Sequence, residues 1–256
     1  SYDKALEYYT LASEQGNTIA MTNIGLMYEY GNGVDKDPKR AVEYYQKAAD
    51  MGDATATVYL GLMYEYGDGV DKDPKRAVEC YQKAADMGDA DATVNLGIMY
   101  KYGNGVDKDP KRAVEYYQKA ADMGDARGQA NLASMYRDGN GVEQSYDKAL
   151  EYYTLASEQG NTNAMTNIGV MYEYGYGVDK DPKRAVEYYQ KAADMGNAAG
   201  QANLASMYRD GNGVQKDYAK AAYWYNECVN NPNADEKIIK DASEQLENPN
   251  VKAALK

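Results

Sequence analysis

The chain has 256 residues, of which 44% are hydrophobic, so it holds enough apolar material for a packed core. Its 40 acidic and 28 basic residues give a net charge of −12, which disfavours binding to a nucleic acid backbone and favours a neutral or basic partner. No apolar run approaches the ~18 residues of a membrane span, and the opening SYDKALEYYT does not resemble a signal peptide. We therefore expect a soluble chain without a membrane span. The sequence does not indicate in which cellular compartment the chain lies.

Residues 1–17 predict a single helix from Tyr2 to Gln15. The same sequence, SYDKALEYYTLASEQGNT, recurs from Ser145, where it forms the second helix of a repeat. The leading segment therefore reads as half a repeat. Because hairpin arrays bury their apolar faces only by stacking on neighbours, we expect this helix to keep an uncovered flank.

Residues 18–230 predict six helical hairpins with a period of 36 residues. The string GNGVDKDPKRAVEYYQKAADMG and its variants begin at Gly31, Gly67, Gly103, Gly139, Gly175 and Gly211. A fixed period of this length is typical of stacked supersecondary units. The near-identity of the copies leaves two origins open, recent duplication and engineered consensus design.

Each repeat predicts two helices joined by a glycine-containing loop. In one repeat the apolar spacing predicts a first helix over Ala54 to Tyr66. The helix should stop at Gly67, because glycine readily adopts the positive φ that ends a helix. Asp73 is the expected N-cap of a second helix, Pro74 to Met87, with proline at its first position.

The repeat pattern ends near Asn231, and residues 231–256 predict a C-terminal helical cap. This segment holds an amphipathic helix with Ile238, Ile239 and Leu246 on its apolar side. An open solenoid end needs such an element, with a polar outer face.

The two cysteines, Cys80 and Cys228, lie four repeats apart. Stacked helical layers are about 8–10 Å apart, whereas a disulfide needs Cα atoms within about 7 Å. We expect two free thiols that serve as packing residues rather than as reactive groups.

The repeat motif resembles that of the Sel-one-like repeat (SLR) family, a relative of the tetratricopeptide repeat. The residues that carry this resemblance in one repeat are Ala56, Leu60, Gly61, Tyr64, Gly67, Gly69, Val70, Asp73, Ala77, Tyr81, Ala84, Ala85 and Gly88. The resemblance implies an all-α fold, a right-handed α-α superhelical solenoid whose first helices line a concave groove. It also implies adaptor work in protein complexes.

Positions that differ between these near-identical repeats indicate where a partner would bind. Three variable columns of the first helices lie on one helical face. Two of them include Asp91, Arg127, Lys101, Arg137 and Arg209, and the third, which varies in size, is Leu26, Leu62, Ile98, Ser134, Val170 and Ser206. By the resemblance, that face is the groove.

Two nearly constant columns are further candidates for the groove. One is Asn23, Asn95, Asn131, Asn167 and Asn203, interrupted by Tyr59, and the other is Tyr30, Tyr66, Tyr102 and Tyr174. An amide offers a donor and an acceptor to a peptide backbone, and tyrosine is a frequent interface anchor. The alternatives are that the asparagines bond to neighbouring helices and that the tyrosines serve packing.

Catalysis and cofactor binding find little support. The chain has no histidine, which removes the commonest general base and metal ligand. Asp35 and Asp37 lack the spacing of a calcium loop, and the Gly-x-Gly loops lack a phosphate-loop lysine. We predict no enzyme, no metal and no cofactor.

The sequence therefore predicts a non-catalytic scaffold that binds a protein or peptide in its groove. One alternative is a structural protein that assembles head to tail with copies of itself, through the uncovered leading helix. Another is an engineered consensus array.

Overall fold

The computed structural model describes residues 2–254. In that part of the chain, all regular secondary structure is helical. They are α1 (Tyr2–Glu14), α2 (Thr18–Tyr30), α3 (Pro38–Asp50), α4 (Ala54–Tyr66), α5 (Pro74–Asp86), α6 (Ala90–Tyr102), α7 (Pro110–Asp122), α8 (Ala126–Asp138), α9 (Tyr146–Glu158), α10 (Thr162–Tyr174), α11 (Pro182–Asp194), α12 (Ala198–Asp210), α13 (Tyr218–Val229), α14 (Glu236–Leu246) and α15 (Pro249–Ala253). None of these helices is long and apolar enough to cross a membrane.

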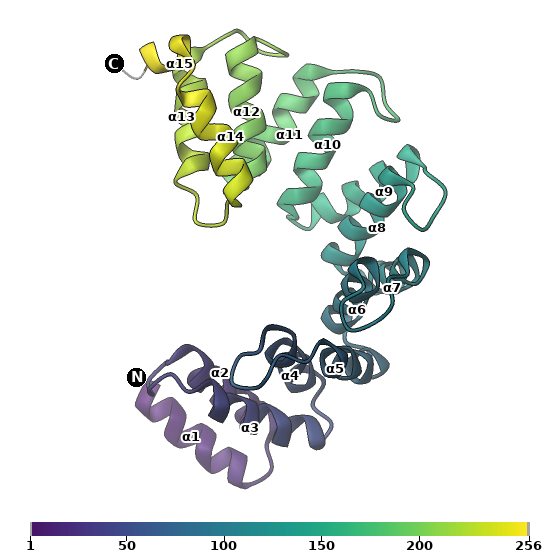
Figure 1. Ribbon diagram of the computed structural model, residues 1–256, viewed down its shortest axis with the longest axis vertical. Coiled ribbons are helices and arrows are strands. Elements are labelled where there is room, and N and C mark those ends of the chain that lie inside the picture. Colours follow the sequence, from purple (N-terminus) through teal and green to yellow (C-terminus); the bar gives the residue numbers. More distant parts are fainter. Residues whose placement is uncertain (1, 255–256) are drawn as a thin grey trace. The chain divides into compact units, whose positions relative to one another are not determined.

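The chain forms two compact units that divide between Gly128 and Gln129, within α8. In each unit, a first helix packs against the second helix that follows it and against the second helix that precedes it, as Figure 1 shows for α2 to α5. The predicted all-helical solenoid of 36-residue repeats is confirmed.

The helix ends follow the predicted capping pattern. Asp73 accepts hydrogen bonds from the backbone N–H groups of Lys75 and Arg76, and Pro74 begins α5. Gly67 ends α4 with a φ of 83°, and its N–H donates to the Met63 carbonyl oxygen. The helices are slightly shorter than predicted, since α5 ends at Asp86 and α1 at Glu14, where the last turns change to non-helical bonding.

The second glycine of a Gly-x-Gly loop permits close packing of consecutive repeats within a unit. A Cβ atom added at Gly69 would lie 2.4 Å from the carbonyl group of Pro38, at the start of the preceding second helix. The loop backbone therefore lies directly on the neighbouring repeat.

One tyrosine of each complete repeat lies in the centre of the core. These fully buried residues are Tyr45, Tyr81, Tyr117, Tyr153, Tyr189 and Tyr225. The first helix provides room for the ring: a Cβ atom added at Gly61 would lie 2.6 Å from the ring of Tyr81. Alanines such as Ala77 and Ala84 fill the remaining close contacts between helices.

The two cysteines are free, as predicted, but only one lies in the core. Cys228 is fully buried in a cluster with Tyr225 and Val251. Cys80 is half-buried and borders a cavity of about 300 Å³, together with Tyr64 and Arg76. Cys228 is therefore a packing residue of the core, as predicted, whereas Cys80 is only partly packed and has a cavity beside it.

The C-terminal residues continue the stacking of unit 2. α14 packs against α13 and α12, much as α12 packs against α11 and α10 (Figure 1). Ala242 of α14 and Val251 of α15 are buried, whereas Lys240 and Glu244 are exposed. The last apolar flank of the repeats is thus covered by a helix with a charged outer face.

Candidate functional site

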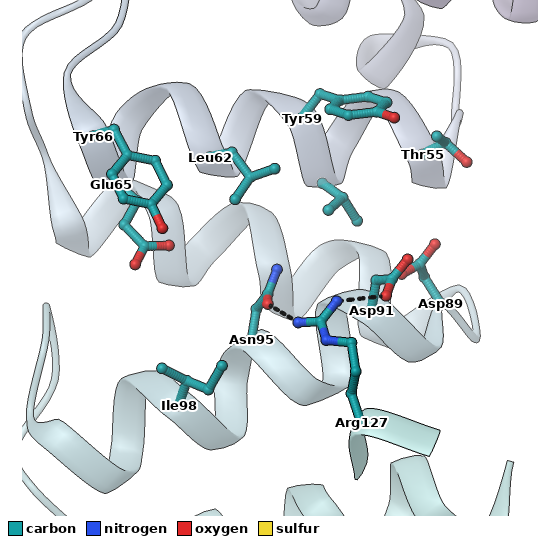
Figure 2. A pocket seen from close by; sticks show the side chains of 11 residues that line it. Thr55, Tyr59, Leu62, Glu65, Tyr66, Asp89, Asp91, Asn95, Ile98 and Arg127 are labelled. Carbon is teal, nitrogen blue, oxygen red and sulfur yellow. Dashed lines mark hydrogen bonds and ion pairs between the residues drawn. The ribbon is translucent and has the colours of Figure 1, made fainter. Parts of the chain in front are cut away.

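Two adjoining cavities lie along the first helices of unit 1. One, of about 270 Å³, lies between α2 and α4, and the other, of about 340 Å³, lies between α4 and α6. Thr55 and Tyr59 border both. We call these two cavities together the unit 1 groove, and Figure 2 shows the larger one.

The larger cavity has acidic side chains at both ends and one cation, with Glu65 at one end and Asp89 and Asp91 at the other (Figure 2). The cation, Arg127, extends from α8 across the edge of the cavity. The Arg127 guanidinium donates to Asp91 at 2.8 Å and to the Asn95 amide oxygen at 3.1 Å. Because the ion pair is largely exposed, it contributes little stability and can exchange for contacts with a partner.

The asparagine column divides into bonded and unbonded side chains. Asn95 accepts from Arg127, and Asn167 accepts from Arg137 while its own amide donates to the Asn163 carbonyl oxygen at 2.8 Å. Among residues 2–254, Asn23, Asn131 and Asn203 form no side-chain hydrogen bond, and Asn23 and Asn203 each border a cavity. Asn95 and Asn167 thus bond to neighbouring helices, and a role of the column in binding a partner stays a prediction.

The tyrosine column lies on the surface. Tyr30, Tyr66, Tyr102 and Tyr174 are 58–65% exposed, so they do not serve the core. Tyr66 borders the larger cavity of the unit 1 groove. Tyr59, which replaces asparagine, stacks on the buried Tyr45 with ring centroids 5.2 Å apart.

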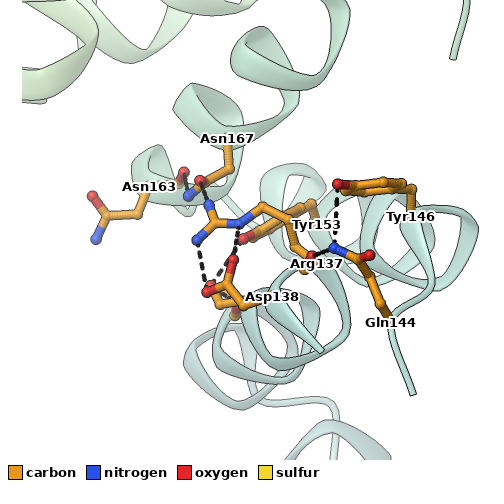
Figure 3. A network of polar contacts seen from close by, with 9 residues as sticks. Arg137, Asp138, Gln144, Tyr146, Tyr153, Asn163 and Asn167 are labelled. Carbon is orange, nitrogen blue, oxygen red and sulfur yellow. Dashed lines mark hydrogen bonds and ion pairs between the residues drawn. The ribbon is translucent and has the colours of Figure 1, made fainter. Parts of the chain in front are cut away.

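In unit 2, the predicted cations Arg137 and Arg209 are held by neighbouring side chains. Arg137 pairs with Asp138 at 2.7 Å and also donates to Asn167, as Figure 3 shows. Arg209 pairs with Asp210 in the same way and donates to Gln245 of α14. Gln245 therefore provides Arg209 with an acceptor, as Asn167 does for Arg137, although it stands at a different position of the pattern.

A set of contacts between helices was not predicted from the sequence. The carboxylates of Glu29, Glu65 and Glu173 accept hydrogen bonds from the hydroxyl groups of Tyr45, Tyr81 and Tyr189, at 2.6–2.7 Å. The sequence shows only that a glutamate recurs sixteen residues before a tyrosine. This constant spacing was the available signal, and it acquires meaning only when the two helices are placed side by side.

The family model of the Sel1 repeat matches residues 1–17, 18–53, 54–89, 90–125, 126–161, 162–197 and 198–227. The chain belongs to the Sel1 repeat family. Members of this family are generally protein-interaction scaffolds and are typically non-catalytic. The predicted resemblance is thereby confirmed.

Two solved Sel1-type structures are similar in sequence and in fold. A Sel1 repeat protein from Oxalobacter formigenes is 37% identical with a TM-score of 0.79, over 83% of this chain and 87% of that one. A protective antigen of uropathogenic Escherichia coli with an SLR fold is also 37% identical, with a TM-score of 0.78. The match covers 88% of this Sel1 repeat chain but only 48% of the antigen.

An immunity protein from Pseudomonas aeruginosa shares the fold at 24% identity and a TM-score of 0.55. No curated protein sequence matches this Sel1 repeat chain. Within residues 2–254, no three acidic or cysteine side chains form a group suited to hold a metal ion.

Proposed function

We propose that the unit 1 groove binds a segment of a partner protein, so that the Sel1 repeats serve as a non-catalytic adaptor. The observation that carries this proposal is the pair of adjoining cavities, because their lining includes positions that differ between otherwise near-identical repeats. Ile19, Thr55 and Asp91 share one such position, and Leu26, Leu62 and Ile98 share another. The equivalent surface of unit 2 is proposed as a second contact surface, with Asn131, Asn167, Asn203, Arg137, Arg209 and Tyr174 as its residues.

The lining favours a partner segment with a basic and an apolar or aromatic side chain. Glu65, Asp89 and Asp91 supply negative charge, whereas Leu62 and Ile98 supply apolar surface. Tyr66 adds an exposed ring at the edge. A basic side chain of the partner that pairs with Asp91 would replace Arg127 there. The Arg127 guanidinium could then donate to an acceptor on the same partner.

The test is selection of binding peptides on the whole chain from a displayed random peptide library, followed by affinity measurement with three variants. Tyr59→Asn installs the residue of the sister repeats, and Asn95→Ala removes the amide that Arg127 contacts. Glu43→Ala, on the exposed side of α3, is the matched control. We expect the two groove variants to lose about tenfold in affinity, because interface anchors typically contribute this much, and the control to bind as the wild type does.

A selected peptide that binds both groove variants with unchanged affinity would contradict this proposal. All three substitutions leave the buried tyrosines and alanines in place, so we expect each variant to fold. Circular dichroism of each variant checks that a loss of binding does not result from a loss of folding.

A second candidate, head-to-tail self-assembly, rests on a comparison of α1 with α9, which have identical sequences. Ala149, Tyr153 and Ala156 of α9 are fully buried, whereas no residue of α1 is buried. Another copy of the chain would cover this surface. Sedimentation velocity over a hundredfold concentration range tests the idea: growth in mass supports it, and a constant monomer mass at every concentration excludes it.

A further inference from the structure

Five of the six buried tyrosine hydroxyl groups have a partner on the first helix of the same repeat. In three repeats the partner is a glutamate, Glu29, Glu65 or Glu173. In two repeats it is a serine: Ser134 and Tyr153 share a hydrogen bond of 2.8 Å, and Ser206 and Tyr225 share one of 2.9 Å. The repeats thus use two alternative ways to satisfy the same hydroxyl group.

Tyr117 is the exception. Its side chain is fully buried, and its hydroxyl oxygen has no hydrogen-bond partner among the described residues. The cause is visible in α6, where Lys101 takes the glutamate position and Ile98 takes the serine position. A buried hydroxyl group without a partner is unfavourable, because it gives up its hydrogen bonds to water without replacement.

Lys101 lacks an acceptor as well. Its ammonium group lies 5.4 Å from the centroid of the Tyr102 ring and forms no ion pair among residues 2–254. Burial raises the pKa of Tyr117, so its hydroxyl group stays protonated and remains a donor. The repeat of Tyr117 therefore has a lysine where three sister repeats have a glutamate, and its buried hydroxyl donor lacks the carboxylate acceptor that they provide.

We propose that this position, between Lys101 and Tyr117, binds a carboxylate group of the partner. This inference rests on the proposed binding function of unit 1 and adds a chemical requirement to it. Lys101 is half-buried, as is Glu65 at the same position of the sister repeat, so this position borders the surface while the Tyr117 hydroxyl oxygen lies beneath it. The carboxylate comes either from an acidic side chain or from the C-terminus of the partner.

Small carboxylates test the site without a known partner. The probes are N-acetylglutamate α-methylamide, for a side-chain carboxylate, and N-acetylglycine, for a C-terminal one. The glutamine counterpart and N-acetylglycinamide are the neutral controls. We expect either or both acids to shift the backbone amide NMR signals of Lys101 and Tyr117 at millimolar concentration, and each neutral control to bind about tenfold more weakly. If one acid alone binds, it identifies the source of the carboxylate, and binding of both shows that the site accepts either source.

Three variants decide whether the binding is at this site. Lys101→Glu supplies the carboxylate from within the chain and should abolish probe binding. Tyr117→Phe removes only the hydroxyl group and should weaken it about tenfold. Lys111→Glu makes the same charge change on the exposed start of α7 and should leave it unchanged. Equal binding of acids and amides, or equal loss with Lys111→Glu, would overturn the proposal.

The peptide selection separates this proposal from the proposed function. If selected peptides bind the groove but lose no affinity in Lys101→Glu, and the small acids do not bind, the carboxylate site is wrong and the groove stands. If no peptide is selected but the small acids bind as expected, the carboxylate site stands and the groove does not.

Discussion

Whether a buried tyrosine hydroxyl group stabilises this protein depends on one residue on the facing helix. Tyr81 donates to Glu65, whereas Tyr117 has no acceptor. Tyr81→Phe should therefore lower the free energy of unfolding by about 1 kcal/mol, while Tyr117→Phe should raise it by about 1 kcal/mol. Urea unfolding of the two variants measures both signs, and a loss of stability in both would contradict the account.

Lys101→Glu should also stabilise the chain, because the new carboxylate accepts from Tyr117 as Glu65 accepts from Tyr81. The expected gain is about 1–2 kcal/mol, and it should vanish when Tyr117→Phe is already present. A double-mutant cycle from unfolding curves isolates this coupling, and additive effects would show that no such bond forms.

The two thiols should react only at high pH. Burial, followed by the charge of Glu79, raises the pKa of Cys80 from 9.0 to about 11, and burial also raises that of Cys228 to about 11. Well below its pKa, a thiol loses tenfold of its reactive thiolate for each unit, so alkylation near pH 8 should be about 100-fold slower than at a thiol of pKa 9. Rates of iodoacetamide labelling in Cys228→Ser, where only Cys80 remains, should still rise between pH 9 and 11. A plateau at pH 9 would contradict the shift.

Single residues were predictable from the sequence where their role is local. Asp73 and Gly67 were correctly predicted as helix caps, because capping depends on neighbours within a few positions. The partner of Tyr81 was not predicted, because Glu65 belongs to another helix and its column varies like a surface position.

Pairs of stacked tyrosines join the two helices in four of the repeats. Tyr28 stacks with Tyr44, and Tyr100 stacks with Tyr116 with ring centroids 5.4 Å apart. In unit 2 the stacked pairs are Tyr136 with Tyr152 and Tyr172 with Tyr188. In the repeat between those of Tyr28 and Tyr100, Cys80 stands in place of the second ring and a cavity of about 300 Å³ lies beside Tyr64.

Cys80→Tyr should therefore fill this cavity and stabilise the repeat by about 1 kcal/mol through a new stacked pair. Thermal unfolding measures the gain, with Cys80→Ala as the control that removes the thiol without adding a ring. A Cys80→Tyr variant less stable than Cys80→Ala would show that the cavity does not accept the ring.

At the scale of helices, the sequence predicted where each helix lies in the chain better than it predicted which helix faces are buried. α1 and α9 have the same thirteen residues, yet Tyr153 is fully buried in α9 and Tyr9 is not buried in α1. Helical periodicity defines the face of such a helix, whereas burial depends on whether another helix packs on it.

For the molecule as a whole, the strict period predicted the repeat architecture. The cavities of the unit 1 groove include residues of the variable columns in their lining, and their role in binding stays a prediction. The depth and charge of the groove were not predictable. They depend on how far α4 and α6 separate and on the position of Arg127, which spans the edge to reach Asp91. Contacts of this kind join side chains 36 residues apart in the sequence.

The central claim is that the first-helix face of unit 1 binds a partner segment. The most direct test is to titrate a selected peptide into the isotope-labelled chain and map the shifted backbone amide signals by NMR. The account predicts shifts concentrated in α2, α4 and α6, around Tyr59 and Asn95. Shifts confined to α3, α5 and α7, or to the uncovered face of α1, would contradict it.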